Sequence, residues 1–282
     1  MKLEPKFVEK PWGRTGLAAV PARLRRRRIG EIWFEAPGGE ALPLLVKHIV
    51  TSERLSVQVH PDDDQARRRG LPGGKSECWY ILDAEPGATI ALGLARPLPM
   101  ARLRAAALDG SIERLLSWRP ARRGDFFYVP AGTIHAIGPG ISLVEVQQPA
   151  DVTYRLFDYG RKRELHLEDA LAVAERAPYP SELIKRAAPD RGTQFVSGPQ
   201  FTMIAAAGRR GAGALNDRDR FAFVLSGIAE AGGDLARAGE CLFVAEGAAL
   251  DCSRDAALLI AGAGEWSEAE AAPPAAERRR AA

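Results

Sequence analysis

The chain has 282 residues, of which 46% are hydrophobic and 27% are charged. This length and composition are typical of a globular protein with a sizeable core, built as one large domain or two small ones. Its 39 basic and 36 acidic residues give a formal net charge of +3, which is too close to balance to indicate a nucleic-acid partner. No apolar run approaches the length of a membrane helix.

Residues 1–13 lack the apolar core of a secretory signal peptide. The three cysteines, Cys78, Cys241 and Cys252, are far apart in the sequence and odd in number. Such cysteines are typical of reduced thiols in a cytosolic protein. We therefore expect a cytoplasmic protein with no nucleic-acid and no membrane partner.

The first part of the chain alternates short runs of strand-forming residues with glycine and proline turns. The clearest predicted strands are EIWFEA (31–36), LPLLVKHIV (42–50), RLSVQVH (54–60), ECWYILDA (77–84) and ATIALGL (88–94). The basic runs at 25–28 and 67–69 fall between these strands, so we expect both runs in solvated loops.

Residues 99–118 change to a helical period that is interrupted at Asp109 and Gly110, which predicts two short helices. Three more predicted strands follow, DFFYVPAG (125–132), HAIG (135–138) and ISLVEVQQ (141–148). A helical stretch at 166–177 then leads into a connector marked by prolines. The later predicted strands are QFVSG (194–198), FTMIAAA (201–207), FAFVLSG (221–227), CLFVAEG (241–247) and AALLIAGAG (256–264).

Many short strands with glycine turns predict a mainly β fold, a barrel or sandwich with small helical insertions. The pattern occurs twice, before and after the connector at 166–190. No clear sequence repeat accompanies it, so the duplication is inferred from strand spacing alone. The residues after 265 are rich in alanine, proline and charge and predict a disordered tail at 266–282.

Gln58 and His60 lie two residues apart in a predicted strand and therefore point to the same face. They form either a polar patch or half of a metal site. Glu77 and Lys75 share a face in the same way, which by itself is more typical of an ion pair than of a metal site. His135 follows a proline-glycine turn. Two imidazoles, a carboxylate and an amide oxygen from three strands would suit zinc or another divalent metal.

Four longer segments extend this pattern: LSVQVHPDD (55–63), GGKSECWYIL (73–82), GDFFYVPAGTIHAIG (124–138) and EVQQPADVTYRLFDYGR (145–161). In this order they resemble the signature segments of class I mannose-6-phosphate isomerase, a zinc enzyme of the cupin superfamily. The segments PWG (11–13), IGEIW (29–33) and PLLVKHI (43–49) are similar to the N-terminal segments of that family. The resemblance covers about residues 5–170.

The resemblance implies two cupin-like β-barrel, or jelly-roll, halves. The expected catalytic, metal-binding domain is 1–165, and a helical connector at 166–190 separates it from a second half at 191–265. The second half contains no histidine, so we expect a degenerate domain without metal ligands.

The resemblance also places the site. Gln58, His60, Glu77 and His135 match the metal ligands, with one zinc per chain or another divalent metal. Lys75, Glu145 and Arg155 fall on catalytic positions. Lys47 and Arg155 fall on substrate-binding positions.

The reaction that the resemblance implies is the interconversion of mannose 6-phosphate and fructose 6-phosphate through an enediol. The partner is then a small sugar phosphate. The base that moves the carbon-bound proton is left open among Lys75, Glu145 and a water on the metal. The alternatives are a catalytically silent sugar-phosphate-binding cupin and an iron-dependent cupin oxygenase.

The chain departs from the family pattern in useful places. Pro149 and Ala150 stand where small polar residues are common, which puts the hydrogen bonding of that loop in doubt. The chain resembles the compact bacterial form, so we expect the helices at 99–118 to form only a small cover beside the pocket. His48 and His166 are interpreted as structural.

Overall fold

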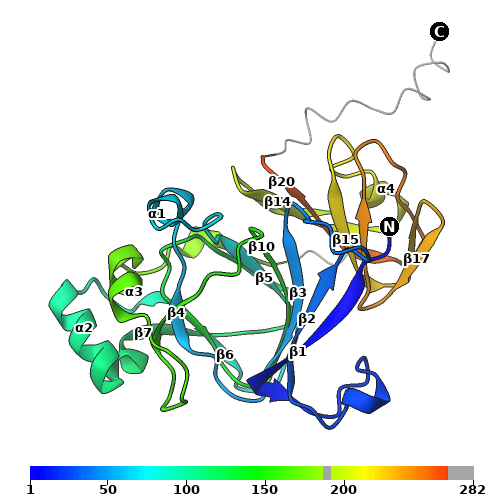
Figure 1. Cartoon of the computed structure of the whole chain (residues 1–282). Helices are drawn as coiled ribbons and strands as arrows, with labels where there is room; N and C mark the ends of the chain where they lie inside the picture. The colour runs from blue at the N-terminus through cyan, green and yellow to red at the C-terminus, as the bar shows by residue number, and fades with distance from the viewer. Residues whose placement is uncertain (187–191, 266–282) are drawn as a thin grey trace. The chain divides into compact units, whose positions relative to one another are not determined.

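The computed structural model describes residues 1–186 and 192–265, so the predicted tail at 266–282 lies outside the described residues. The described chain is mainly β, as predicted, and it divides into two compact units (Figure 1). Of the described residues, the larger, N-terminal unit comprises Glu4–Glu35 and 39–186. The smaller, C-terminal unit comprises Met1–Leu3, Ala36–Gly38 and 192–265. None of the described helices is long and apolar enough to cross a membrane.

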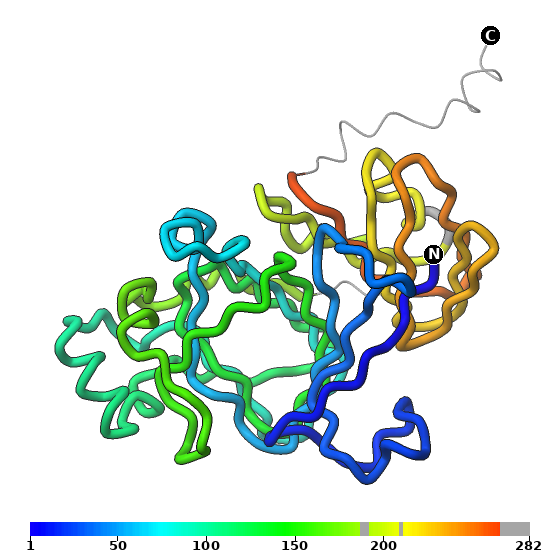
Figure 2. The backbone as a smooth tube through the Cα atoms, viewed as in Figure 1, coloured from blue at the N-terminus to red at the C-terminus, as the bar shows by residue number. Residues whose placement is uncertain are grey.

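The N-terminal unit contains two antiparallel sheets that face each other (Figure 2). The seven-stranded sheet has the order β1 (Glu4–Arg14), β2 (Ile29–Glu35), β3 (Leu45–Val50), β10 (Ile141–Gln147), β5 (Glu77–Ala84), β8 (Asp125–Val129), β12 (Ile184–Arg186). The five-stranded sheet has the order β11 (Tyr154–Phe157), β4 (Val57–Val59), β9 (His135–Ile137), β6 (Thr89–Leu94), β7 (Leu116–Pro120). The helices of this unit are η1 (Ala22–Leu24), α1 (Asp63–Arg68), α2 (Met100–Asp109), η2 (Ser111–Leu115), α3 (Leu167–Val173) and η3 (Ser181–Leu183).

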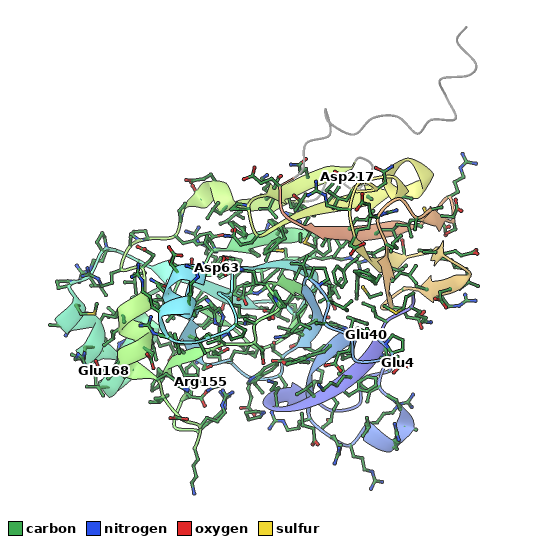
Figure 3. The ribbon with its side chains drawn as sticks, turned by 45° about the horizontal axis from the view of Figure 1, so that its top comes forward. Glu4, Glu40, Asp63, Arg155, Glu168 and Asp217 are labelled. Atoms are coloured by element: carbon green, nitrogen blue, oxygen red, sulfur yellow. The ribbon has the colours of Figure 1, made fainter. Side chains whose placement is uncertain are left out.

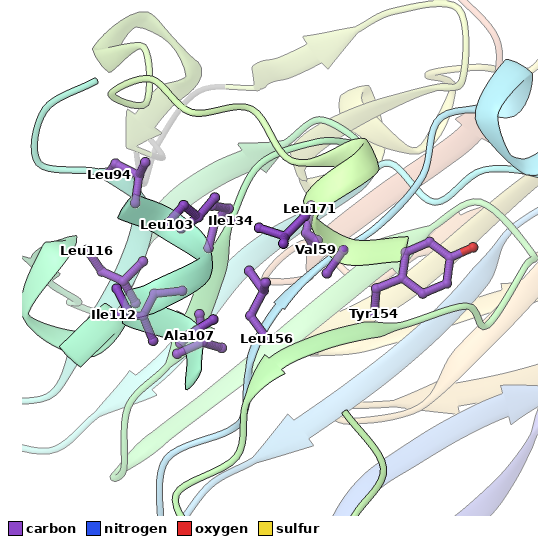
Figure 4. Close-up of a cluster of buried hydrophobic side chains, with 14 of the residues drawn as sticks. Val59, Leu94, Leu103, Ala107, Ile112, Leu116, Ile134, Tyr154, Leu156 and Leu171 are labelled. Carbon is purple, nitrogen blue, oxygen red and sulfur yellow. The ribbon is translucent and has the colours of Figure 1, made fainter. Parts of the chain in front are cut away.

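The five-stranded sheet buries both of its faces. Val57 and Val59 of β4 are fully buried in an apolar cluster with residues of α2 and α3, which cover the outer face of the sheet (Figure 4). The side chains of β6 that point the other way, including Ile90 and Leu92, join a second cluster between the two sheets. Because strand side chains alternate, Gln58 points from β4 toward the space between the sheets.

The C-terminal unit repeats the two-sheet plan on a smaller scale. One sheet has the order β13 (Thr193–Ser197), β14 (Phe201–Ala207), β20 (Ala257–Ala263), β15 (Arg220–Ser226), β18 (Cys241–Val244). The other has the order β17 (Asp234–Arg237), β16 (Ile228–Ala231), β19 (Asp251–Cys252), and one short helix, α4 (Gly208–Ala212), follows β14. Its buried cluster contains many alanines together with leucine, isoleucine and valine.

The predicted helices at 99–118 are only partly right. The helix α2 is present, but only a 3-10 turn follows Gly110, and Leu116 to Pro120 form the edge strand β7. Leu116 pairs with Leu94 and Trp118 with Ala91, so the free edge of β6 outweighs the local helical period. No residue of α2 lines the pocket described below, so this helix supports the back of the sheet instead of covering the site.

The prediction of a loop at 67–69 is also wrong, because 67 and 68 lie in α1. Asp62 caps this helix: its side chain accepts from the Gln65 backbone N–H at 2.7 Å, and the Gln65 amide oxygen accepts from the Asp62 N–H at 3.0 Å. This reciprocal capping box satisfies two amide groups that the helix leaves free. The Asp-x-x-Gln spacing at 62–65 is a sequence signal for this helix that the prediction of a loop overlooked.

The loop after α1 contains two adjacent glycines, of which only Gly74 is closely packed against the backbone. A Cβ on Gly74 would lie 2.5 Å from the Asp62 carbonyl carbon and 2.6 Å from the Asp63 nitrogen, whereas one on Gly73 would contact only Asp63 Oδ1, at 3.7 Å. Gly74→Ala should lower the free energy of unfolding by about 1–3 kcal/mol, because backbone atoms cannot move aside. Gly73→Ala is the matched control and should change it little. Equal denaturant midpoints for the two variants would contradict this packing.

Candidate active site

Three buried polar side chains converge between the sheets of the N-terminal unit. His60 follows β4, Glu77 begins β5 and His135 begins β9, and each is at most 2% exposed. Glu77 Oε2 lies 3.5 Å from His60 Nε2, and Glu77 Oε1 lies 3.3 Å from His135 Nε2. One ligating atom from each residue falls within 4.8 Å of the others, which is close enough for one metal ion to reach all three.

Gln58 adds an amide to this cluster. It pairs with His135 across β4 and β9, and its Nε2 lies 3.1 Å from His135 Nε2. The Ser56 hydroxyl donates to the side-chain oxygen of Gln58, Oε1, at 3.1 Å. Rotation of the amide by 180° would turn that oxygen toward the histidines, where it could serve as a fourth ligand.

Both imidazoles are held neutral. Burial lowers the pKa of His135 to about 4 and that of His60 well below its usual value, and the nearby Lys75 charge acts in the same direction. His135 Nδ1 lies 2.9 Å from the Thr133 carbonyl oxygen, so Nδ1 carries the proton and Nε2 keeps its lone pair. A neutral imidazole with a free Nε2 lone pair is the form that binds a metal.

The carboxylate at the centre lacks full compensation. Burial, together with the charge of Glu145, raises the pKa of Glu77 to about 8, and Lys75 opposes this rise. The Lys75 ammonium lies 3.0 Å from Glu77 Oε2, but Oε1 receives no hydrogen bond from the described residues. A fully buried carboxylate beside two neutral imidazoles is a site that a divalent cation would stabilise, so the residues fit the expected metal.

A cavity of about 270 Å³ opens beside the cluster, lined in part by Gln58. Its charged lining residues are Lys10, Lys47, Lys75, Arg155 and Arg163 among the cations and Glu31, Glu145 and Asp151 among the anions. The positive charges outnumber the negative ones, which suits an anionic ligand such as a phosphate monoester.

Glu145 lies in the wall of this cavity between two lysines. Its Oε1 is 3.4 Å from Lys47 Nζ, and its Oε2 accepts from Trp79 Nε1 at 3.1 Å. Burial opposes ionisation of Glu145, but Lys75 and Lys47 outweigh it and lower the pKa. Glu77 and Glu145 raise the pKa of Lys75 despite its burial, so the wall holds an ionised Glu145 and a protonated Lys75.

Comparison with known proteins identifies the family of this chain. No protein-family model matches the chain. Over 211 residues it is 36% identical to a mannose-6-phosphate isomerase of Bacillus subtilis, covering 61% of this chain and 67% of the relative. The chain belongs to the class I mannose-6-phosphate isomerase family.

Two further relatives agree with this assignment. The chain is 44% identical over 137 residues to the mannose-6-phosphate isomerase of Streptococcus mutans, covering 46% of this chain and 43% of the relative. The crystal structure of the mannose 6-phosphate isomerase from Bacillus subtilis matches with a TM-score of 0.75 and 26% identity, over 93% of this chain and 98% of that one. The predicted cupin-like fold is therefore confirmed.

The structure brings all the predicted site residues of this family member to one place. The four predicted ligands form the cluster, and the four predicted catalytic and substrate residues line the cavity beside it. Arg155, which is labelled in Figure 3, lies on β11. It is paired directly with Gln58 of β4. His48 lies elsewhere, with its Nε2 2.8 Å from Ser142 Oγ, and it lines no part of the cavity.

Some lining residues were not predicted. Lys10 reaches the cavity from β1 and is held by Glu31 at 3.1 Å, and Asp151 pairs with Lys47 at 2.9 Å. His166, interpreted as structural, also lines the cavity, next to Arg155. The one available signal was position: Lys10 directly precedes the PWG segment, and Asp151 lies inside the Gln-Gln-Pro-Ala-Asp segment.

Removal of a histidine ligand tests the cluster. His60→Ala or His135→Ala should abolish stoichiometric metal binding, because each removes one imidazole nitrogen from a buried site with few other donors. The bound metal is measured by atomic emission on the purified full chain. His48→Ala is the control and should keep its metal, since His48 lies outside the cluster. Full occupancy in either cluster variant would refute the assignment of the ligands.

Proposed function

We propose that this chain is a mannose-6-phosphate isomerase that interconverts mannose 6-phosphate and fructose 6-phosphate with a divalent metal as cofactor. The observation that carries the proposal is the buried cluster of His60, Glu77 and His135 at the wall of a cationic cavity. The names of the related proteins support the same reaction. Zinc suits the nitrogen and oxygen donors, although other divalent metals accept the same set.

The metal would be held by His60, Glu77 and His135, with Gln58 as a fourth ligand. When bound, a divalent cation supplies Lewis-acid stabilisation of negative charge that develops on the sugar oxygens. The Thr133 carbonyl fixes the tautomer of His135, and Lys75 neutralises part of the charge of Glu77.

Isomerisation transfers a proton between C1 and C2 through an enediol. Glu145 is our choice for the base, because it is ionised, faces the cavity and is held by Trp79 and Lys47. Lys75 is protonated, so it suits a different role, in which it donates to a substrate oxygen as negative charge grows there. The structure thus favours Glu145 over Lys75 among the bases left open by the sequence.

The phosphate would bind at the side of the cavity that Arg155 and Arg163 line. Arg155 Nε is buried and has no hydrogen-bond partner among the described residues, so the guanidinium retains a free donor. Burial and the neighbouring Arg163 both lower the pKa of Arg155, which an anion would reverse. A guanidinium fork matches the geometry of phosphate oxygens. Lys47 provides a further positive charge in the same cavity.

The test of the function is a coupled assay that follows fructose 6-phosphate formed from mannose 6-phosphate. We expect turnover that a chelator abolishes and that added zinc restores. Glu145→Gln should keep the metal but lose at least about 100-fold in rate, as expected for loss of a general base. Metal binding without turnover would favour a silent sugar-phosphate-binding cupin. Oxygen consumption with iron would favour the oxygenase.

Arg155 can be tested separately. Arg155→Ala should leave metal and fold intact and lower turnover roughly 30- to 1000-fold, because a charge-assisted contact to the phosphate or enediolate is lost. Arg155→Lys should recover little, since a point charge does not replace a fork. Arg161→Ala is a matched control: Arg161 pairs with Glu53 and Asp158 and does not line the cavity. Near-normal turnover of the Arg155 variants would place the phosphate elsewhere.

A further inference from the structure

We infer that Gln148 is a positioning residue for the site, an inference that rests on the metal dependence proposed above. Gln148 follows β10 and is half-buried; it lines neither the cavity nor the ligand cluster. Its side chain and backbone instead form hydrogen bonds with the loop that carries Lys75 and Glu77. The position of these two groups would therefore depend on a residue whose hydrogen bonds go to Ser76 and Asp63.

These hydrogen bonds join Gln148 to Ser76, the residue between Lys75 and Glu77. The Gln148 side-chain oxygen accepts from the Ser76 N–H at 2.8 Å, and the Gln148 N–H donates to the Ser76 carbonyl at 3.1 Å. Ser76 is thus bound at both of its peptide groups by one residue. Its hydroxyl in turn accepts from the Ala131 N–H at 3.2 Å, which ties the same point to the turn before His135.

The other end of the Gln148 amide holds the loop to helix α1. Gln148 Nε2 donates to both carboxylate oxygens of Asp63, at 3.0 and 3.2 Å. Asp63 Oδ1 also accepts from the Gly74 N–H at 2.8 Å. One amide therefore joins α1, the loop and the end of β10, and the loop is held on either side of Lys75.

This arrangement makes a specific demand on the side chain at 148. It must accept on one atom and donate on the other, because Ser76 presents an N–H and Asp63 presents a carboxylate. Glutamine meets both demands, methionine neither, and glutamate would set two carboxylates against each other. Residues that hold metal ligands in place from outside the ligand set typically change metal affinity by about 10- to 100-fold when they are lost.

The experiment compares Q148M with Q65M in the full chain. Both remove a glutamine whose side chain bonds to the backbone near α1, but the Gln65 side chain caps the helix through the Asp62 N–H instead of holding the loop at 73–77. We expect Q148M to weaken Co²⁺ binding about 10- to 100-fold in a chelator competition and to change the visible spectrum of the bound cobalt. Q65M should stay within about twofold of the unmodified chain.

A rescue variant separates positioning from general stability. Q148E should weaken Co²⁺ binding at least as much as Q148M, and Q148E combined with D63N should recover part of the loss, because donor and acceptor are exchanged between the two positions. Amide hydrogen exchange at Gly74 and Ser76, measured with chelator present, should be faster in Q148M than in Q65M. This second readout requires no metal.

The outcomes distinguish the two proposals. Unchanged cobalt affinity and unchanged exchange in Q148M would overturn the positioning role, as would equal losses in Q148M and Q65M. If the unmodified chain binds no cobalt and shows no isomerase activity, the proposed function fails. In that case faster amide hydrogen exchange in Q148M would still support the role of Gln148 in holding the loop in place. Unchanged amide hydrogen exchange would overturn that role.

Discussion

The burial of Glu77 is the constraint on which the site depends. A carboxylate with no exposed surface between two sheets is costly unless cations or donors surround it. The structure surrounds it with charges that alternate in sign: Asp151 pairs with Lys47 at 2.9 Å, Lys47 with Glu145 at 3.4 Å, and Lys75 with Glu77 at 3.0 Å. Lys47 keeps one partner if either Asp151 or Glu145 is removed, whereas removal of Lys75 would leave the buried Glu77 without its ion pair.

The period of two in the strands explains why so much of the site could be predicted. Val57 and Val59 face the helices behind the sheet, so Gln58 faces the interior, toward His135. Same-face spacing selected Gln58 with His60, and the position after a proline-glycine turn selected His135. The family segments extended the set to Lys47, Glu145 and Arg155. Every one of these residues lies at the cluster or the cavity.

What the sequence did not reveal depends on contacts between distant segments. Lys10 reaches the cavity because β1 pairs with β2, where Glu31 holds it. The sequence of residues 116–118 alone favours a helix. These residues form the edge strand β7 instead because β6 offers backbone groups with which they can pair. Neither fact is encoded within a short window, since each requires knowledge of which strand lies alongside.

The loop at Pro149 and Ala150 shows how a segment without polar side chains satisfies its backbone. The Gln147 amide donates to the Ala150 carbonyl at 3.0 Å and to the Gln148 carbonyl at 2.9 Å, so a residue of β10 satisfies the loop from inside the sheet. Proline also lacks an N–H, so it adds no donor that the loop would have to satisfy. The loop therefore needs no polar side chain at 149 or 150 for Asp151 to pair with Lys47 in the cavity wall.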